Sequence, residues 1–375
     1  MYYLEKNIEN LDRIFDQNSR EGYLRLDLNE NPEGLPQDFI NKVLKDITPE
    51  FVAKYPETLE FTQILAGYLH TDIDHICLTN GSSEGIRQII EAFTSPNGRI
   101  VGVTPTYAMF EVYPKMYGRN FIPVKYTDDL RMPVENILKE LTPKTELLIL
   151  LNPNNPMGNA YSEIEFQRII DSAKRNKITV LVDEAYMYFY PNSFINYALT
   201  NEHIFVTRTF SKLFSLAGCR LGYVVGWPEG IKMVQKLCTP HNVNAFAMKF
   251  AKEIIKTPGM IHDLILHYKE GKEFLIKSLK EHEYSFNAKE GNFIFIKPKT
   301  NACVLVKRMK NEERILIKTY SGIGKLGTCL RVTTGGIKPM KRFLEALYKL
   351  DLENIPGGGW GNVITKPFYF IGVAA

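Results

Sequence analysis

One lysine of the chain lies among residues that are suited to binding an anion. Lys212 ends the run TFSK, in which Thr209 and Ser211 carry hydroxyl groups, and Arg220 follows eight positions later. A lysine amine forms a Schiff base with an aldehyde when burial or neighbouring positive charge favours its unprotonated form. Hydroxyl groups and a guanidinium, which can form two parallel hydrogen bonds, are what a phosphate dianion needs. The run therefore predicts a site for an aldehyde that carries a phosphate group.

Four further residues are suited to holding a pyridine ring. Asp183 follows an apolar run, where a carboxylate needs a partner. That partner can be a structural one, in a salt bridge or a helix cap, or it can be the protonated nitrogen of a bound ring. Tyr186 and Asn155 can each hydrogen-bond the phenolic oxygen of such a ring. Tyr107 can stack on it, although an ordinary core tyrosine explains this residue equally well. Together with Lys212, these residues indicate a pyridoxal 5'-phosphate (PLP) enzyme.

A helix is expected to begin near Ser82 and Ser83, which are favourable N-cap residues. Apolar residues recur behind them at the i, i+3, i+4 and i+7 positions of a helix, namely Ile86, Ile89, Ile90 and Phe93. Because the N–H groups at a helix start attract anions, the amides of this segment are expected to add to the phosphate site.

Four apolar runs predict strands that are buried on both faces, as in a parallel sheet covered by helices. They are residues 100–103, 147–151, 179–182 and 203–206. Each run is followed by polar residues that include the candidates above. Ligands of open α/β sheets bind outside the carboxyl ends of the strands. We therefore expect the four polar segments to lie at one edge of the sheet.

The pattern changes beyond about residue 265, where shorter runs predict the strands of a smaller sheet. These runs are residues 292–296, 315–318 and 330–333, and a helix at 343–348 follows them. The expected organisation has four parts: an N-terminal segment at 1–45 that packs with the small domain, a large cofactor-binding domain at 46–260, a small C-terminal domain at 261–355, and a tail at 356–375.

The segment from Gly322 to Gly327 matches the dinucleotide-binding pattern GxGxxG, but its context is wrong. Residues 328–332 behind it predict a strand, whereas a pyrophosphate site needs a helix start at that point. We therefore interpret the glycines as a hairpin loop, which argues against a Rossmann-type oxidoreductase.

Composition excludes several other classes. The net charge of the 375 residues is only +4, with no basic block typical of binding to nucleic acid or a membrane surface. No long apolar stretch predicts a membrane span, and the N-terminus lacks the pattern of a signal peptide. The cysteines show no paired spacing, which is typical of reduced thiols in a cytoplasmic protein. They are Cys77, Cys219, Cys238, Cys303 and Cys329. No cluster of metal ligands is evident.

At this point the chain resembles the class I/II aminotransferases of PLP fold type I, and among them most of all the histidinol-phosphate aminotransferases. The resemblance runs from about Leu28 to Leu350. The matching stretches are 29–32 with Gly34, 55–56, 81–84, 105–107, 152–156 with Gly158, 183–186, 209–220, 242–244 and 330–332. It implies an α/β fold with a mainly parallel seven-stranded sheet flanked by helices, and a smaller α/β domain from the N- and C-terminal parts.

The resemblance also implies roles for particular residues. Lys212 would be the Schiff-base lysine and would shuttle the proton. Tyr55 would reach the cofactor phosphate of a second subunit, which implies a homodimer. Arg331, Lys318 and Asn31 would bind the substrate, with Arg331 on its anionic end.

Four departures from the family fall on the substrate side. The family usually has an arginine thirteen residues before Arg331, where this chain has Lys318, a point charge in place of a bidentate fork. Ser83 stands where the family commonly has aspartate, and Met157 replaces the usual threonine. The N-terminal Pro-Tyr segment, which helps to cover the substrate in the family, has no clear match.

Two reactions remain open. The first is ping-pong transfer of an amino group between an amino acid, glutamate with 2-oxoglutarate, and a small phosphorylated amino or keto compound, histidinol phosphate or a related one. The alternative is decarboxylation of a phosphorylated amino acid, because the opening residues 27–36 resemble those of threonine-phosphate decarboxylases. The choice depends on which substrate bond lies perpendicular to the ring, which the sequence does not reveal.

Overall fold

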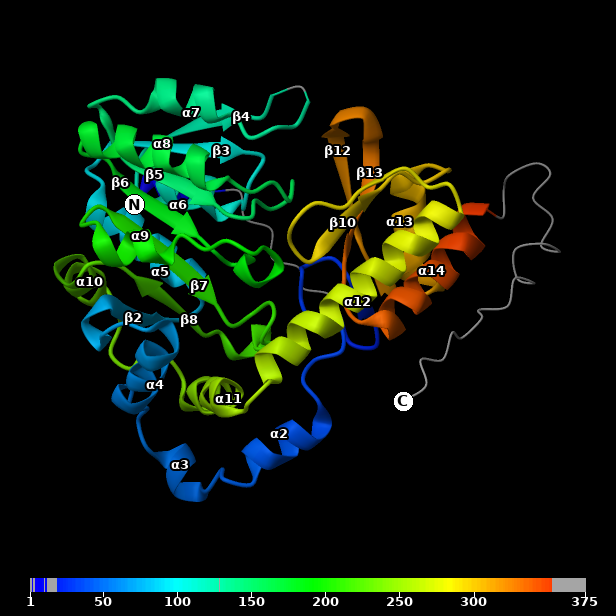
Figure 1. Cartoon of the computed structure of the whole chain (residues 1–375), viewed down its shortest axis with the longest axis horizontal. Helices are drawn as coiled ribbons and strands as arrows, with labels where there is room; N and C mark the ends of the chain where they lie inside the picture. The colour runs from blue at the N-terminus through cyan, green and yellow to red at the C-terminus, as the bar shows by residue number, and fades with distance from the viewer. Residues whose placement is uncertain (1, 3, 10, 12–18, 128, 353–375) are drawn as a thin grey trace.

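The chain forms a large domain and a smaller one, with helix α12 (Met260–Glu281) running between them (Figure 1). The structure, a computed structural model, describes residues 2, 4–9, 11, 19–127 and 129–352. The tail expected at 356–375 lies outside the described residues.

The large domain is built on a seven-stranded sheet with the order β2-β8-β7-β6-β5-β3-β4. The strands from β7 to β4 are mutually parallel, whereas β8 is antiparallel to both of its neighbours. The predicted mainly parallel sheet is therefore confirmed. The strands are β2 (Ile76–Thr79), β3 (Arg99–Thr104), β4 (Asn120–Lys125), β5 (Thr145–Leu151), β6 (Thr179–Asp183), β7 (Ile204–Thr209) and β8 (Gly222–Val225).

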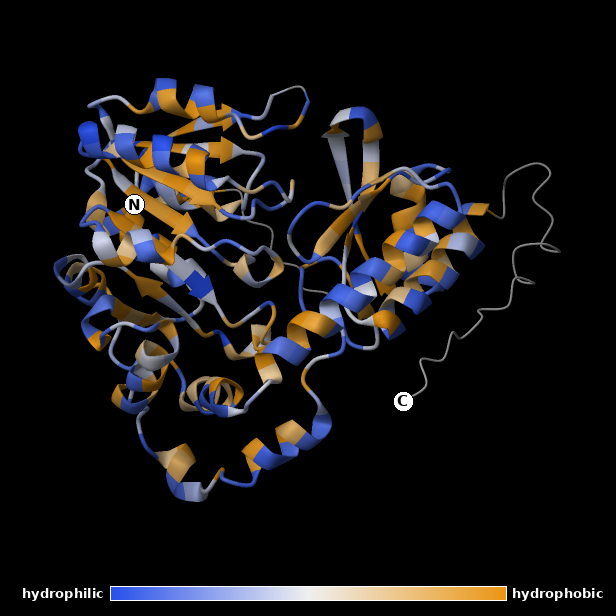
Figure 2. Cartoon of the chain, viewed as in Figure 1, coloured by the Kyte–Doolittle hydropathy of each residue, from blue (hydrophilic) through white to orange (hydrophobic). Residues whose placement is uncertain are grey.

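Both faces of this sheet are covered, because successive side chains of a strand point to opposite faces. In β6, Val180 and Val182 enter one hydrophobic core and Leu181 enters the other. Figure 2 shows hydrophobic residues concentrated along these strands. The first core is closed by α4 (Leu59–Leu69), α7 (Val134–Glu140), α8 (Glu163–Arg175), α9 (Ile195–Thr200) and α11 (Ala245–Lys256), and the second by α5 (Ser82–Phe93), α6 (Met109–Met116) and α10 (Pro228–Gln235).

The small domain packs helices against an antiparallel sheet with the order β12-β13-β10-β9. Its elements are β9 (Phe286–Asn287), β10 (Phe293–Ile296), α13 (Ala302–Glu312), β12 (Lys318–Ile323), β13 (Gly327–Thr333) and α14 (Ile337–Leu352). Strands β12 and β13 form the hairpin predicted for the glycine-rich segment, and only the short helix η4 (Gly324–Leu326) lies between them. Among the described residues, no helix combines the length and apolarity needed to cross a bilayer.

The N-terminal segment is shared between the two domains, whereas we expected all of residues 1–45 to pack with the small one. Strand β1 (Leu24–Arg25) does so, since it pairs in parallel with β11 (Ile315–Leu316). Helix α1 (Lys6–Glu9) instead contacts α6, and α2 (Gln37–Leu44) contacts α11. The remaining short elements are α3 (Pro49–Ala53), η1 (Ile73–His75), η2 (Met187–Phe189) and η3 (Ala217–Cys219).

Candidate active site

The candidate residues of the large domain gather where parallel strands end. Strand β6 ends at Asp183, which lies opposite Thr207 of β7, and β7 ends two residues later at Thr209. Strand β5, the other neighbour of β6, ends just before the segment 152–156. The polar segments therefore meet at one edge of the sheet, as the sequence predicted.

An anion cradle is formed where α5 begins beside Arg220. Gly81 is the N-cap residue, with a φ of 72° that suits glycine, so Ser82 and Ser83 are the first helical residues and not the caps expected from the sequence. A Cβ atom on Gly81 would collide with the Arg220 guanidinium, and one on Gly222 would lie 2.5 Å from the amide nitrogen of Ser82. The guanidinium and the positive end of the helix thus lie against each other.

Hydroxyl groups complete this cradle. Arg220 Nη1 donates to Ser211 Oγ at 3.2 Å, and Thr209 Oγ1 donates to the same oxygen at 2.9 Å. Ser83 Oγ lies 3.1 Å from the hydroxyl of Tyr107, which joins the helix start to the segment after β3. The donors suit a phosphate dianion, and Arg220 is exposed enough to be reached by one.

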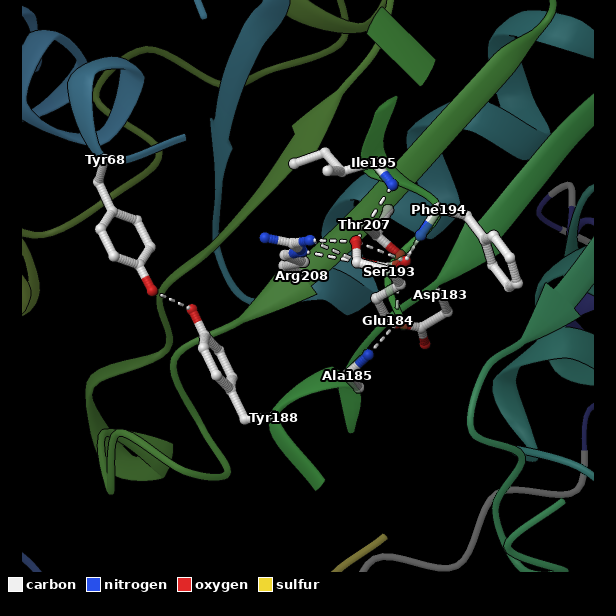
Figure 3. Close-up of polar contacts among 10 residues, drawn as sticks. All are labelled: Tyr68, Asp183, Glu184, Ala185, Tyr188, Ser193, Phe194, Ile195, Thr207 and Arg208. Atoms are coloured by element: carbon white, nitrogen blue, oxygen red, sulfur yellow. Dashed lines mark hydrogen bonds and ion pairs between the residues drawn. The ribbon is translucent and has the colours of Figure 1, made fainter. Parts of the chain in front are cut away.

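Asp183 is a buried carboxylate with a fixed orientation. Its Oδ1 accepts hydrogen bonds from the Ala185 amide at 3.1 Å and from Thr207 Oγ1 at 3.2 Å (Figure 3). Burial nevertheless raises the pKa of Asp183 to about 7. A cation placed beside this carboxylate would restore its charged form, so the site suits a protonated ring nitrogen.

The hydroxyl of Tyr186 is held by two amides. It accepts hydrogen bonds from Asn29 Nδ2 at 2.8 Å and from Asn155 Nδ2 at 3.1 Å. Burial raises the pKa of Tyr186 well above its usual range, so the hydroxyl stays protonated and able to donate. The sequence did not single out Asn29. Its one signal was its place in the matching stretch 29–32.

Lys212 lies beside this tyrosine. Its Nζ donates to the backbone oxygen of Leu28 at 2.9 Å and lies 5.8 Å from the centroid of the Tyr186 ring. Burial, and then the positive charge of Arg331, lower the pKa of Lys212 to about 8. The unprotonated form, which reacts with an aldehyde, is therefore far more populated near neutral pH than in an ordinary lysine.

Arg331 is buried at the small-domain side of the site. Its Nη1 donates to Asn155 Oδ1 at 2.8 Å, and its Nη2 donates to the backbone oxygen of Asp27 at 2.6 Å. Lys318 lies opposite Arg331 across strands β12 and β13. Burial, followed by the positive charge of Arg331, lowers the pKa of Lys318. Arg331 thus contacts Asn155, one of the cofactor candidates, and Lys318 lies beside Arg331.

Two other predicted residues lie farther from this centre. The Asn31 amide donates to Ser215 Oγ at 2.6 Å and to the Gly34 oxygen at 3.0 Å, contacts that fasten the N-terminal loop to the segment after Lys212. Tyr55 is 77% exposed and stacks on His241, with ring centroids 4.4 Å apart. Its exposure leaves it available to another chain.

A buried ion pair behind Asp183 was missed by the sequence analysis. Glu184 Oε2 lies 2.8 Å from Arg208 Nη2, and the two side chains are 0% and 6% exposed (Figure 3). Ser193 Oγ donates to the carboxylate at 2.9 Å and accepts from Arg208 at 2.6 Å. Glu184 and Arg208 each follow one of the paired residues Asp183 and Thr207, so they anchor the two strand ends that carry the carboxylate.

The residues present fit PLP group by group. The cradle suits its phosphate, Asp183 its ring nitrogen, Tyr186 its phenolic oxygen and Lys212 its aldehyde. The family model described as "Aminotransferase class I and II" matches residues 21–347. The chain therefore belongs to the class I and II aminotransferases and is a PLP-dependent aminotransferase of fold type I.

Individual relatives show which aminotransferases this chain resembles. A histidinol-phosphate aminotransferase of Caldanaerobacter subterraneus subsp. tengcongensis is 30% identical over 87% of this chain and 92% of its own. A second, from Thermotoga maritima, is 30% identical over 72% of this chain and 78% of its own.

Solved structures agree with this fold. The histidinol-phosphate aminotransferase of Clostridium acetobutylicum is 25% identical, with a TM-score of 0.77 over 88% of this chain and 99% of its own. That of Sinorhizobium meliloti, solved in complex with pyridoxal-5'-phosphate, has a TM-score of 0.83 at 19% identity over 93% of this chain and 98% of its own.

Proposed function

We propose that the protein transfers an amino group between glutamate or 2-oxoglutarate and a small phosphorylated amino or keto compound of the histidinol-phosphate kind, by a ping-pong mechanism. The observation that carries this proposal is the pair of cations Arg331 and Lys318, which lie opposite each other on β12 and β13, with Arg331 close enough to lower the pKa of Lys212. Histidinol-phosphate aminotransferases among the relatives support the same substrate class.

PLP, when bound, supplies an electrophilic carbonyl carbon and a ring that withdraws electrons from the substrate's α-carbon. The cradle of Arg220, Ser211, Thr209 and the amides of Ser82 and Ser83 holds its phosphate. The carboxylate of Asp183 keeps the ring nitrogen protonated. The hydroxyl of Tyr186, held by Asn155, would donate to the phenolic oxygen, and Tyr107 would be the residue to stack on the ring.

Lys212 attaches the cofactor and then moves the proton. With PLP bound, its Nζ would hold the aldehyde carbon, and as a free amine it would be placed to take the proton from the substrate's α-carbon and to return it. The pKa of about 8 suits both acceptance and release of that proton near neutral pH.

The charged ends of the substrate orient it in the site. Arg331, fixed by Asn155 and the Asp27 carbonyl, holds one carboxylate or phosphate by a two-pronged contact. Lys318 holds a second anionic group. Asn31, which fastens the N-terminal loop to the segment after Lys212 through its contact with Ser215, would lie beside the substrate.

We also propose a homodimer in which Tyr55 reaches the cofactor phosphate of the second subunit. Exposed apolar side chains surround Tyr55 on α2, α3, α4 and α11, which supports an interface at this face. They are Leu44, Val52, Leu59 and Phe246, exposed by 46%, 60%, 58% and 40%. A cytoplasmic location is the accompanying proposal.

Half-reactions of the holoenzyme test the proposed activity. Glutamate should convert the cofactor to its amine form and release 2-oxoglutarate, and a phosphorylated ketone should reverse the change. Release of carbon dioxide from a phosphorylated amino acid without any keto-acid acceptor would instead favour the decarboxylase. Absence of amino exchange with every donor would contradict an aminotransferase of this specificity.

A further inference from the structure

A third cation, Arg20, lies near the proposed substrate residues, since its guanidinium contacts the Asp27 side chain and Arg331 contacts the Asp27 backbone oxygen. Burial first, and then the positive charges of Arg331 and Arg20, lower the pKa of Lys318, while Asp27 is the one group that acts in the opposite direction. Like charges held together in a partly buried place repel one another unless an anion joins them. The cluster of Arg20, Lys318 and Arg331, called here the cation cluster, therefore suits an anionic ligand.

The contacts of Arg20 show how that ligand would be bound. Its Nη2 lies 2.5 Å from Asp27 Oδ1, and the two side chains are only 20% and 13% exposed. The Nε atoms of Arg20 and Arg331 are both buried, and neither has a hydrogen-bond partner among the described residues. Two guanidinium groups of one cluster thus each keep a buried donor to offer.

Arg20 also offsets the departure at position 318. The family's usual arginine there would present a planar fork, whereas Lys318 presents a single point charge. Arg20 brings a planar fork to the same cluster from the N-terminal segment, just ahead of β1. The cation cluster therefore contains two planar guanidinium groups, those of Arg20 and Arg331, and one ammonium group, that of Lys318.

We propose that Arg20 is a specificity-determining residue that binds the phosphate monoester of the substrate together with Lys318 and Arg331. The inference rests on the proposed function and refines it. A dianionic phosphate gains from two cations at once, whereas an uncharged hydroxyl gains from neither. The subsite therefore selects phosphorylated amino compounds over their unphosphorylated alcohols, with Asp27 holding Arg20 in place until the phosphate binds.

The variant Arg20→Gln tests the proposal, with Arg25→Gln as its matched control. Arg25 is a neighbouring arginine, 43% exposed and 3.7 Å from Glu30, and it is not among the charges that shift Lys318. With holoenzyme, kcat/KM for histidinol phosphate should fall about 10- to 100-fold in Arg20→Gln, the usual loss for a charge-assisted hydrogen bond. Turnover of L-histidinol should stay unchanged, and Arg25→Gln should resemble the wild type with both substrates.

A second variant covers the case in which Arg20→Gln fails to fold. Asp27→Asn removes the nearer of the two carboxylates that compete for Arg20, the other being Glu30 at 3.7 Å, so phosphate-bearing substrates should bind several-fold more tightly. If the Arg20–Asp27 ion pair were purely structural, both Arg20→Gln and Asp27→Asn would have a lower melting temperature. The kcat/KM values for histidinol phosphate and L-histidinol would then change equally. That equal change, or no selective loss in Arg20→Gln, would overturn the proposal.

A binding probe separates this inference from the proposed function. Glycerol 3-phosphate, which cannot be transaminated, should perturb the visible absorbance of wild-type holoenzyme at a lower concentration than of Arg20→Gln. If that difference holds while no phosphorylated substrate turns over, the proposed function is wrong and the phosphate subsite stands. If glycerol 3-phosphate binds neither protein, or both equally, the subsite is wrong.

Discussion

Lys318 and Arg331 lie directly opposite each other on the antiparallel strands β12 and β13. Residues paired in this way project to the same face of a sheet, so the two positive charges enter one space. Asn155 and the Asp27 carbonyl fix the Arg331 guanidinium, and thereby tie the substrate residues of the small domain to the cofactor residues of the large one. Under the proposed function, this link would bring an anionic end of the substrate close to Lys212.

The pair predicts a selective effect of Lys318→Met. Removal of the ammonium group should raise KM for a phosphorylated substrate about tenfold, as expected for one charge-assisted contact, with a smaller change in kcat. Lys318→Arg should keep the affinity. Steady-state kinetics with histidinol phosphate checks both, and an unchanged KM in Lys318→Met would remove this residue from the substrate site.

The variant Asp183→Asn should lose activity without losing stability of the apoenzyme. Without the carboxylate the charge on the ring nitrogen is no longer stabilised, so the rate of the glutamate half-reaction should fall by about 100-fold or more. The pKa of Asp183, about 7, lies above the value of ~3.9 for an exposed aspartate.

Its charged form therefore destabilises the apoenzyme, and the contribution of this group to stability falls as the pH rises from about 4 to 7. Apoenzyme carrying Asp183→Asn should consequently melt at the same or a higher temperature than the wild type at pH 8. A variant that is less stable and still fully active would contradict the assigned role.

The pKa of Lys212 predicts a pH profile for cofactor attachment. Because the amine reacts unprotonated, the rate at which apoenzyme binds PLP covalently should rise with pH and level off above about 8. The positive charge of Arg331 contributes to the lowered pKa, so Arg331→Met should move the midpoint to higher pH. Lys318→Met, a control that is not among those causes, should leave it in place. Stopped-flow absorbance across the pH range measures the midpoints.

Much of this site could be predicted because its residues follow strands directly. Asp183, Asn155 and Lys212 come just after apolar runs, and parallel neighbours bring such positions to one edge. The strands β2, β4 and β8 were not located. Strand β4 contains Pro123, and β2 and β8 are only four residues long, too short for a clear apolar run.

The functional residues that could not be predicted from the sequence make contacts between distant segments. The side chain of Asn29 contacts Tyr186, which is 157 positions away in the sequence. The backbone N–H of Asn29 donates to the hydroxyl of Thr333, which is 304 positions away. Glu184 and Arg208 read as ordinary charges at strand ends until the fold buries them together. No local pattern encodes such pairs, because they depend on how the two domains meet or how strands align.

Two glycine substitutions test the phosphate cradle. A Cβ on Gly222 would lie 2.5 Å from the Ser82 amide nitrogen and 2.6 Å from the carbonyl carbon of Gly81, so Gly222→Ala must displace the start of α5. The Kd for PLP should rise about tenfold or more, equivalent to a loss of ~1.4 kcal/mol. Gly218→Ala is the matched control, since its Cβ would meet nothing within 4 Å. Equal affinities for PLP in the two variants would argue against the cradle.

The Glu184–Arg208 pair should be costly to break. Replacing either partner alone leaves an unpaired buried charge, so Glu184→Gln and Arg208→Met should each lower the free energy of unfolding by about 3–5 kcal/mol. The double variant Glu184→Met with Arg208→Met should lose far less than the sum. Urea denaturation measures these differences, and the exposed pair Glu50 and Lys54 provides a control in which Glu50→Gln changes nothing measurable. Additive losses would mean that the two side chains are not coupled.

The covalent role of Lys212 is tested most directly by reducing the yellow holoenzyme with borohydride and locating the attached cofactor by peptide mass spectrometry. The cofactor should be found on Lys212, and Lys212→Ala should retain none after the same treatment. The chain offers its own competitor, because burial also lowers the pKa of Lys272 to about 8. Attachment to Lys272, or an undiminished adduct in Lys212→Ala, would contradict the assignment.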